Sequence, residues 1–173
     1  MSLKTKNFVC CGGVYRTKQF AAVPGLELLY QFDKASPLEV LEFTEVQIDD
    51  DWFPLNTREN INDLVVDPLG YAAPLFVLKE VCNAVKFMNF GFLDKWVGIK
   101  IPSRFQTQAK NVRSEYTAPI VSNLIQADKA TLRELEEYYS VEDAFKMFDI
   151  VLVSTVNKAY AHEEAEKESK RRK

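Results

Sequence analysis

Residues 130–161 constrain the fold more than any other part of this sequence, because they contain two consecutive helix starts and a long apolar stripe. Thr131 and Glu134 have the spacing of a capping box, in which each side chain bonds the other residue's backbone. Ser140 and Asp143 repeat that spacing further along. After the second start, apolar residues recur at three- and four-residue steps: Phe145, Phe148, Leu152, Val156 and Ala159. The stretch therefore predicts a short helix followed by a long amphipathic helix that runs into the tail.

The N-terminal end has a different pattern, in which strand-favouring residues flank two glycines. Gly12 and Gly13 tolerate the positive φ of a tight turn, so residues 8–17 predict a β-hairpin. Further along, the triplet Asp49–Asp51 lies in a region that breaks the helical pattern. We expect this triplet to form a solvated loop, because the spacing of a calcium-binding loop is missing.

The segments between these two ends favour helices. Ser36 and Glu39 form a third capping-box pattern, with Pro37 at the first helical position. Apolar residues after Pro74 keep helical spacing and predict a central helix that ends or kinks at Gly91. The predicted fold is therefore mainly α-helical with a small N-terminal β-hairpin.

Composition along the chain also predicts how it is divided. We expect an α+β front part over residues 1–100 and an all-helical back part over residues 112–173. The polar residues 101–111 show no clear period and are predicted to be the linker between these parts.

The overall composition disfavours several classes of partner. A net charge of −3 with acids and bases mixed along the chain disfavours nucleic-acid binding. No apolar run reaches the roughly 18 residues of a membrane span, so no membrane partner is expected. Three cysteines and one histidine, without a C-x-x-C pair, disfavour structural zinc and a disulfide scaffold and fit a reducing cytoplasm.

Residues suited to catalysis are also missing from the sequence. The single histidine, His162, lies in the charged terminal stretch, and no nucleophile, nucleotide-binding or kinase motif is present. We therefore expect no catalytic residue, no metal site and no cofactor, and we predict that the chain is not an enzyme but acts in binding or assembly.

Aromatic side chains are the candidates for partner binding. One group follows the central helix and another lies at the junction of the two C-terminal helices, and packing in the core is the alternative interpretation for every member. The candidates are Phe90, Phe92, Trp96, Tyr138, Tyr139, Phe145 and Phe148.

The order of several motifs resembles that of phage tail assembly chaperones. The C-terminal pieces are "ATLREL" (residues 130–135) and "YSVEDA" (residues 139–144), followed by a long helix with Asn157 near its exposed end. The N-terminal pieces are "VYRTKQFAAVPGLELLYQF" and the "NFG" of residues 89–91. The acidic "IDDDWFPLN" region has no counterpart in this pattern.

This resemblance implies a transient role in tail building. Such chaperones bind the helix-rich tape-measure protein in the host cytoplasm, keep it soluble, leave when tail-tube protein polymerises, and are absent from the mature virion. The alternative is a permanent virion component, such as a baseplate, tail-end or connector protein. Self-association is left open.

Overall fold

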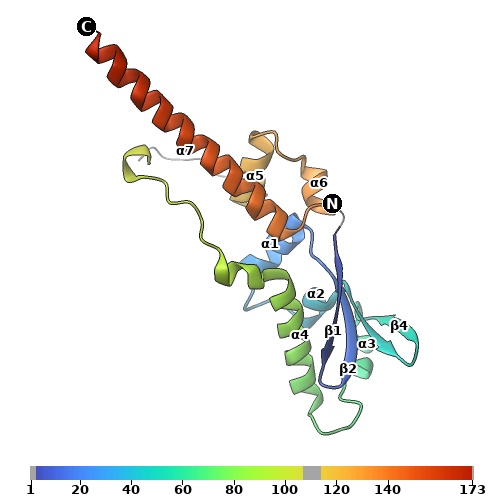
Figure 1. The fold of residues 1–173 in the computed structure, drawn as a ribbon. Coiled ribbons are helices and arrows are strands. Elements are labelled where there is room, and N and C mark those ends of the chain that lie inside the picture. Colours follow the sequence, from blue (N-terminus) through green and yellow to red (C-terminus); the bar gives the residue numbers. More distant parts are fainter. Residues whose placement is uncertain (1–2, 107–113, 173) are drawn as a thin grey trace.

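The computed structural model describes residues 3–106 and 114–172, so residues 107–111 of the predicted linker lie outside the described residues. Figure 1 shows a sheet and several helices at one end and a long helix that extends away from them. The α+β front part and the helical back part are confirmed.

The strands are β1 (Thr5–Cys10), β2 (Gly13–Lys18), β3 (Thr44–Ile48) and β4 (Asp51–Pro54). The helices are α1 (Ala22–Tyr30), α2 (Pro37–Leu41), α3 (Arg58–Leu64), α4 (Pro74–Phe90), α5 (Pro119–Gln126), α6 (Leu132–Glu137) and α7 (Val141–Arg171), with short 3₁₀ helices η1 (Gly91–Lys95) and η2 (Ser103–Phe105).

The four strands form one antiparallel sheet in the order β1-β2-β3-β4. The predicted hairpin is its first half, with Val9 opposite Val14 in the register. Its turn is made by Cys11 and Gly12, whose φ angles are 47° and 77°, so the turn lies one residue before the predicted glycine pair.

The prediction of a solvated loop around Asp49–Asp51 was wrong in part, because this region is the hairpin of β3 and β4. Asp49 adopts a φ of 53° at the turn, a conformation that aspartate reaches more readily than most residues. Asp51 already belongs to β4 and pairs with Ile48. The three carboxylates are exposed at the tip of the hairpin, so the strands can form without burying charge.

One face of the sheet packs into the core. Tyr15 and Val46 are opposite each other on β2 and β3 and are both buried. Thr17 and Thr44 are also buried on this face, where the Thr44 hydroxyl donates to the Thr17 hydroxyl at 3.0 Å. This bond satisfies two polar groups that burial would otherwise leave unpaired. The other face carries Arg16 of β2, which is ion-paired with Glu45.

The front and back parts meet where α1 and α7 begin. The Ala22 N–H donates to the Tyr139 carbonyl at 2.8 Å, and Ala21 forms a β-bridge with Ser140. Gly25 of α1 lies against Val141, so the two helices cross closely. A single cluster of buried apolar residues includes members of both parts. The division at residues 100 and 112 stays a prediction.

The three predicted capping boxes are all present, at Ser36, Thr131 and Ser140. The last of them starts α7, which has 31 residues and is therefore about 46 Å long. Only Val141 and Ala144 of this helix are fully buried. Its C-terminal end extends away from the rest of the molecule (Figure 1). Within the described residues, none of the helices combines the length and the apolar character needed to cross a membrane.

Asn89, near the end of α4, links this helix to the chain that leads into α1. Its side-chain oxygen accepts from the Phe20 N–H at 2.9 Å, and its amide donates to the Val85 carbonyl at 3.0 Å. The Asn89→Ala variant should lose about 1–2 kcal/mol of unfolding free energy, because the buried Phe20 N–H would lose its acceptor. Urea denaturation measures this loss. Asn83→Ala on the exposed side of α4 is the control, and an equal loss in both variants would contradict this role.

Asp67 organises the loop before α4. Its carboxylate accepts from the backbone N–H groups of Leu69, Tyr71 and Ala72 at 2.8–2.9 Å, and these bonds, that of Leu69 first, lower the pKa of Asp67. A lowered pKa in the folded state stabilises the fold above the unfolded pKa of about 3.9, and this contribution is lost as pH falls through the folded value.

The stability advantage of the wild type over Asp67→Asn should therefore be full at pH 7 and shrink below about pH 4. Urea denaturation at a series of pH values measures this difference. Asp63→Asn, at an exposed position of α3, is the control. An advantage that stays constant from pH 7 to pH 2 would show that the charge of Asp67 does not stabilise the loop.

Candidate protein-binding surface

Three aromatic rings fix the base of α7 to the segment that follows α4. Phe92 and Trp96 lie at η1, and Phe145 lies on the second turn of α7. Each ring contacts the other two edge to face, with centroids 5.5–6.0 Å apart. Such contacts add to the free energy of apolar burial. The structure thus joins candidates from both predicted groups into one cluster.

The remaining predicted residues are placed differently. Phe90 is buried in the core, where its ring stacks on Phe20 at 6.1 Å and meets Phe32 edge to face. Tyr139 and Phe148 are half-buried against the core. Tyr138 is 43% exposed, the most accessible of the seven candidates, and its ring lies edge to face with that of Tyr139. Contact of these residues with a partner stays a prediction.

Beyond its base, α7 carries apolar side chains that the rest of the described chain leaves uncovered. We call residues 150–171 the outer segment of α7. Ile150, Val153 and Tyr160 are 61%, 38% and 42% exposed, and with Asn157 they recur at three- and four-residue steps. These positions share one face of the helix. The predicted stripe through Phe148, Leu152 and Val156 faces another side and is half-buried.

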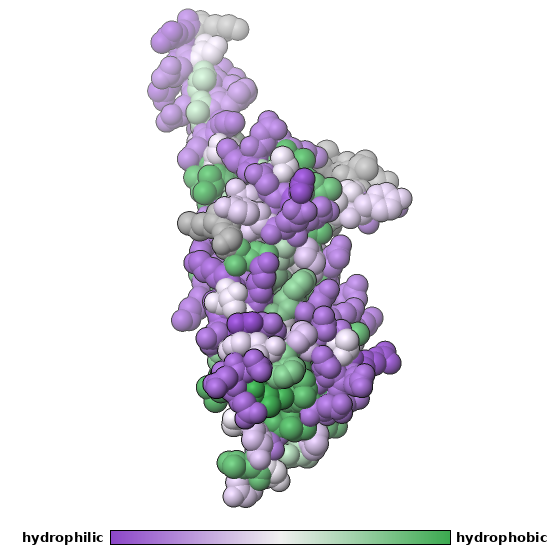
Figure 2. All heavy atoms as spheres, turned by 90° about the vertical axis from the view of Figure 1, so that its right-hand side faces the viewer, coloured by the Kyte–Doolittle hydropathy of each residue, from purple (hydrophilic) through white to green (hydrophobic). Residues whose placement is uncertain are grey.

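Past Tyr160 the outer segment becomes hydrophilic, and Figure 2 shows mainly hydrophilic side chains at the extended end of the molecule. Lys167 bonds Glu163 at 2.6 Å, and His162 lies 3.4 Å from Glu166. Both pairs are four residues apart, a spacing that places the two side chains side by side on an exposed helix, although the His162 pair is ionic only when the imidazole is protonated. The apolar part of the outer segment is therefore confined to its first three turns.

A short segment of the chain touches the same part of α7. The Phe105 ring meets the Tyr160 ring edge to face at 5.0 Å, and the Arg104 guanidinium pairs with Glu163 at 3.1 Å. Lys167 and then Arg104 lower the pKa of Glu163. This contact covers one side of Tyr160 and leaves Ile150 and Val153 exposed.

The exposed stripe was not predicted, because the longer apolar period through Phe148, Leu152 and Val156 marks another face of this helix. Its signal is nonetheless visible, since Ile150, Val153 and Tyr160 follow a second helical period. Exposed apolar side chains also occur far from α7, at the start of α4 and in the loop before it. They are Leu69, Tyr71, Leu75 and Phe76.

In the described part of the chain, the cysteine and tyrosine side chains with strongly raised pKa values do not form a reactive site. Burial raises the pKa of Cys82 to about 11, and burial with the neighbouring Cys11 raises that of Cys10 to about 11. Thiols with such pKa values are protonated at neutral pH and are weak nucleophiles. Burial also raises the pKa of Tyr15 to about 12. Among the described residues, no three histidine, cysteine or carboxylate side chains are placed to hold a metal ion.

Comparison with known proteins leaves this surface as the main guide to function. No protein-family model, curated protein or solved structure matches the chain.

Proposed function

We propose that this chain is a phage tail assembly chaperone, a non-enzymatic protein that binds the tape-measure protein and keeps it soluble in the host cytoplasm. The observation that carries the proposal is the outer segment of α7. It presents Ile150 and Val153 on an exposed helical face that the rest of the described chain does not cover. A helix with one apolar face uncovered is suited to pairing with a helix of a partner.

The nature of the partner comes from the resemblance of the C-terminal motifs to those of tail assembly chaperones. A tape-measure protein exposes long apolar helical surface before the tail forms and would otherwise aggregate. A narrow stripe on one helix supplies modest affinity for each copy. Complexes of modest affinity dissociate quickly, which suits displacement by tail-tube protein and absence from the mature virion.

Co-expression tests this function. The protein to co-express is the product of the largest open reading frame, among those beside the gene for this chain, that encodes a helix-rich protein. The proposal predicts that this large protein is soluble only when co-expressed with this chain and that the two proteins elute together. A large protein that remains insoluble, with none retained on this chain, would contradict it.

Mass spectrometry of purified virions separates this function from a permanent structural role. A chaperone should be missing from the virion or present in trace amounts. A fixed copy number per particle would identify the chain as a baseplate, tail-end or connector protein instead.

A further inference from the structure

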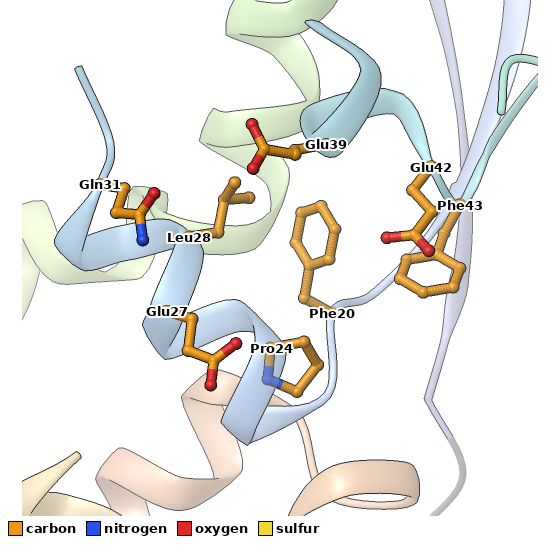
Figure 3. A pocket seen from close by; sticks show the side chains of 8 residues that line it. All are labelled: Phe20, Pro24, Glu27, Leu28, Gln31, Glu39, Glu42 and Phe43. Atoms are coloured by element: carbon orange, nitrogen blue, oxygen red, sulfur yellow. The ribbon is translucent and has the colours of Figure 1, made fainter. Parts of the chain in front are cut away.

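A pocket between α1 and α2 combines an apolar floor with an acidic rim (Figure 3). Phe20 stands at its centre, and Leu28 lies beside it on α1. The Phe43 ring meets the Phe20 ring edge to face, with centroids 5.9 Å apart. Phe20 and Leu28 are buried, whereas Phe43 is exposed and offers part of its ring to the pocket.

Three glutamates surround this floor, with Glu27 on the α1 side and Glu39 and Glu42 on the opposite side (Figure 3). Within the described residues, none of the three pairs with a lysine or arginine. The Glu39 Oε2 accepts from the Ser36 hydroxyl and N–H at 2.7 Å, which leaves Oε1 available. The Ser36 hydroxyl and then its N–H lower the pKa of Glu39, so this group carries a negative charge at neutral pH.

The chain holds two of its own cations elsewhere between an aromatic ring and an oxygen acceptor, which is a carboxylate for Arg16 and a backbone carbonyl for Lys86. The Arg16 guanidinium lies 4.3 Å from the centre of the Trp52 ring and pairs with Glu45. The Lys86 ammonium lies 4.4 Å from the centre of the Phe32 ring and donates to the Phe32 carbonyl at 2.7 Å. In both cases an aromatic face and an oxygen acceptor hold one cation.

The pocket presents an aromatic ring and carboxylates, and no lysine or arginine is among the described residues that line it. On their other side, Glu42 and Phe43 line a neighbouring pocket with Arg16 and Lys18. Neither of these cations pairs with Glu42.

We therefore propose that this pocket binds an arginine side chain of a partner protein. The alkyl stem would lie on Phe20 and Leu28, and the guanidinium would stack on Phe43 within reach of Glu27 and Glu42. The carboxylates are spread around the pocket, which suits a broad planar cation better than a metal ion.

This inference is independent of the tape-measure proposal, and a small probe tests it directly. The probe is N-acetyl-arginine amide, titrated into the full chain and followed by NMR. The expected result is a saturable change in the signals of Phe20, Leu28 and Phe43 in the millimolar range. N-acetyl-citrulline amide, a neutral molecule of the same shape, should cause little change. Equal changes with both probes, or changes only elsewhere, would overturn the proposal.

Two variants test the residues named. Glu27→Gln with Glu42→Gln should weaken probe binding by about fivefold or more, and Phe43→Leu should also weaken it by removing the aromatic face. Glu39 is left intact because it caps α2. The control variant carries Glu59→Gln and Glu136→Gln, which make the same charge change at exposed positions of α3 and α6 that do not line the pocket. Unchanged affinity in both pocket variants would contradict the assignment.

Discussion

Replacing Gly25 with alanine is expected to destabilise the protein by about 2–3 kcal/mol, although alanine favours helices in general. A methyl group on Gly25 would overlap the Val141 side chain and lie 2.9 Å from the Phe20 Cβ. The crossing of α1 and α7 therefore requires a residue without a side chain at this position. A thermal scan should show a fall in melting temperature of about 2–4 °C for each kcal/mol.

Val141→Ala provides the matched control for this result. Alone it should also destabilise the fold, because it leaves a cavity beneath the start of α7. Combined with Gly25→Ala, it should restore part of the lost stability, since it removes the methyl groups that clash. The loss of unfolding free energy in the double variant could instead equal the sum of the two single losses. That result would show that the contact with Val141 is not what excludes a side chain at position 25.

If the proposed function holds, placing a charge on the exposed stripe of α7 is expected to abolish retention of the tape-measure partner. Ile150→Asp and Val153→Asp each put a carboxylate where the proposed partner helix packs, and burying an unpaired charge is costly. Both side chains are exposed, so the fold should remain stable. Co-expression and pull-down measure retention, and circular dichroism checks that α7 is still helical.

Two controls locate this effect on the molecule. Thr155→Asp introduces the same charge on another side of α7, and retention should be unchanged. Leu75→Asp alters a side chain that is 79% exposed at the start of α4. If Leu75→Asp lost retention of the partner and Ile150→Asp did not, the binding surface would lie on the front part of the molecule and not on α7.

Local signals in the sequence predicted the local features of the fold. The capping boxes at Ser36, Thr131 and Ser140 depend on residues three positions apart, so they could be identified before any tertiary contact was known. The second hairpin was missed because the run of aspartates dominated its turn, while Val46 and Ile48 gave only a short strand pattern.

Contacts between distant residues could not be predicted. The contact between Phe92 and Phe145 joins residues more than fifty positions apart, so it depends on the tertiary packing of η1 against α7. In α1, the four-residue step from Leu26 to Tyr30 favours an inner position for Tyr30, but Tyr30 is exposed and Leu28 is buried. Leu28 lies beside Phe20, a neighbour that helical spacing alone does not reveal.

Hydrogen–deuterium exchange on the co-purified complex tests the central claim most directly, because it reports which part of the chain the proposed tape-measure partner covers. The account predicts slower exchange in the first turns of the outer segment of α7, around Ile150 and Val153, than in the free chain. Unchanged exchange in α7, with slower exchange elsewhere, would contradict it.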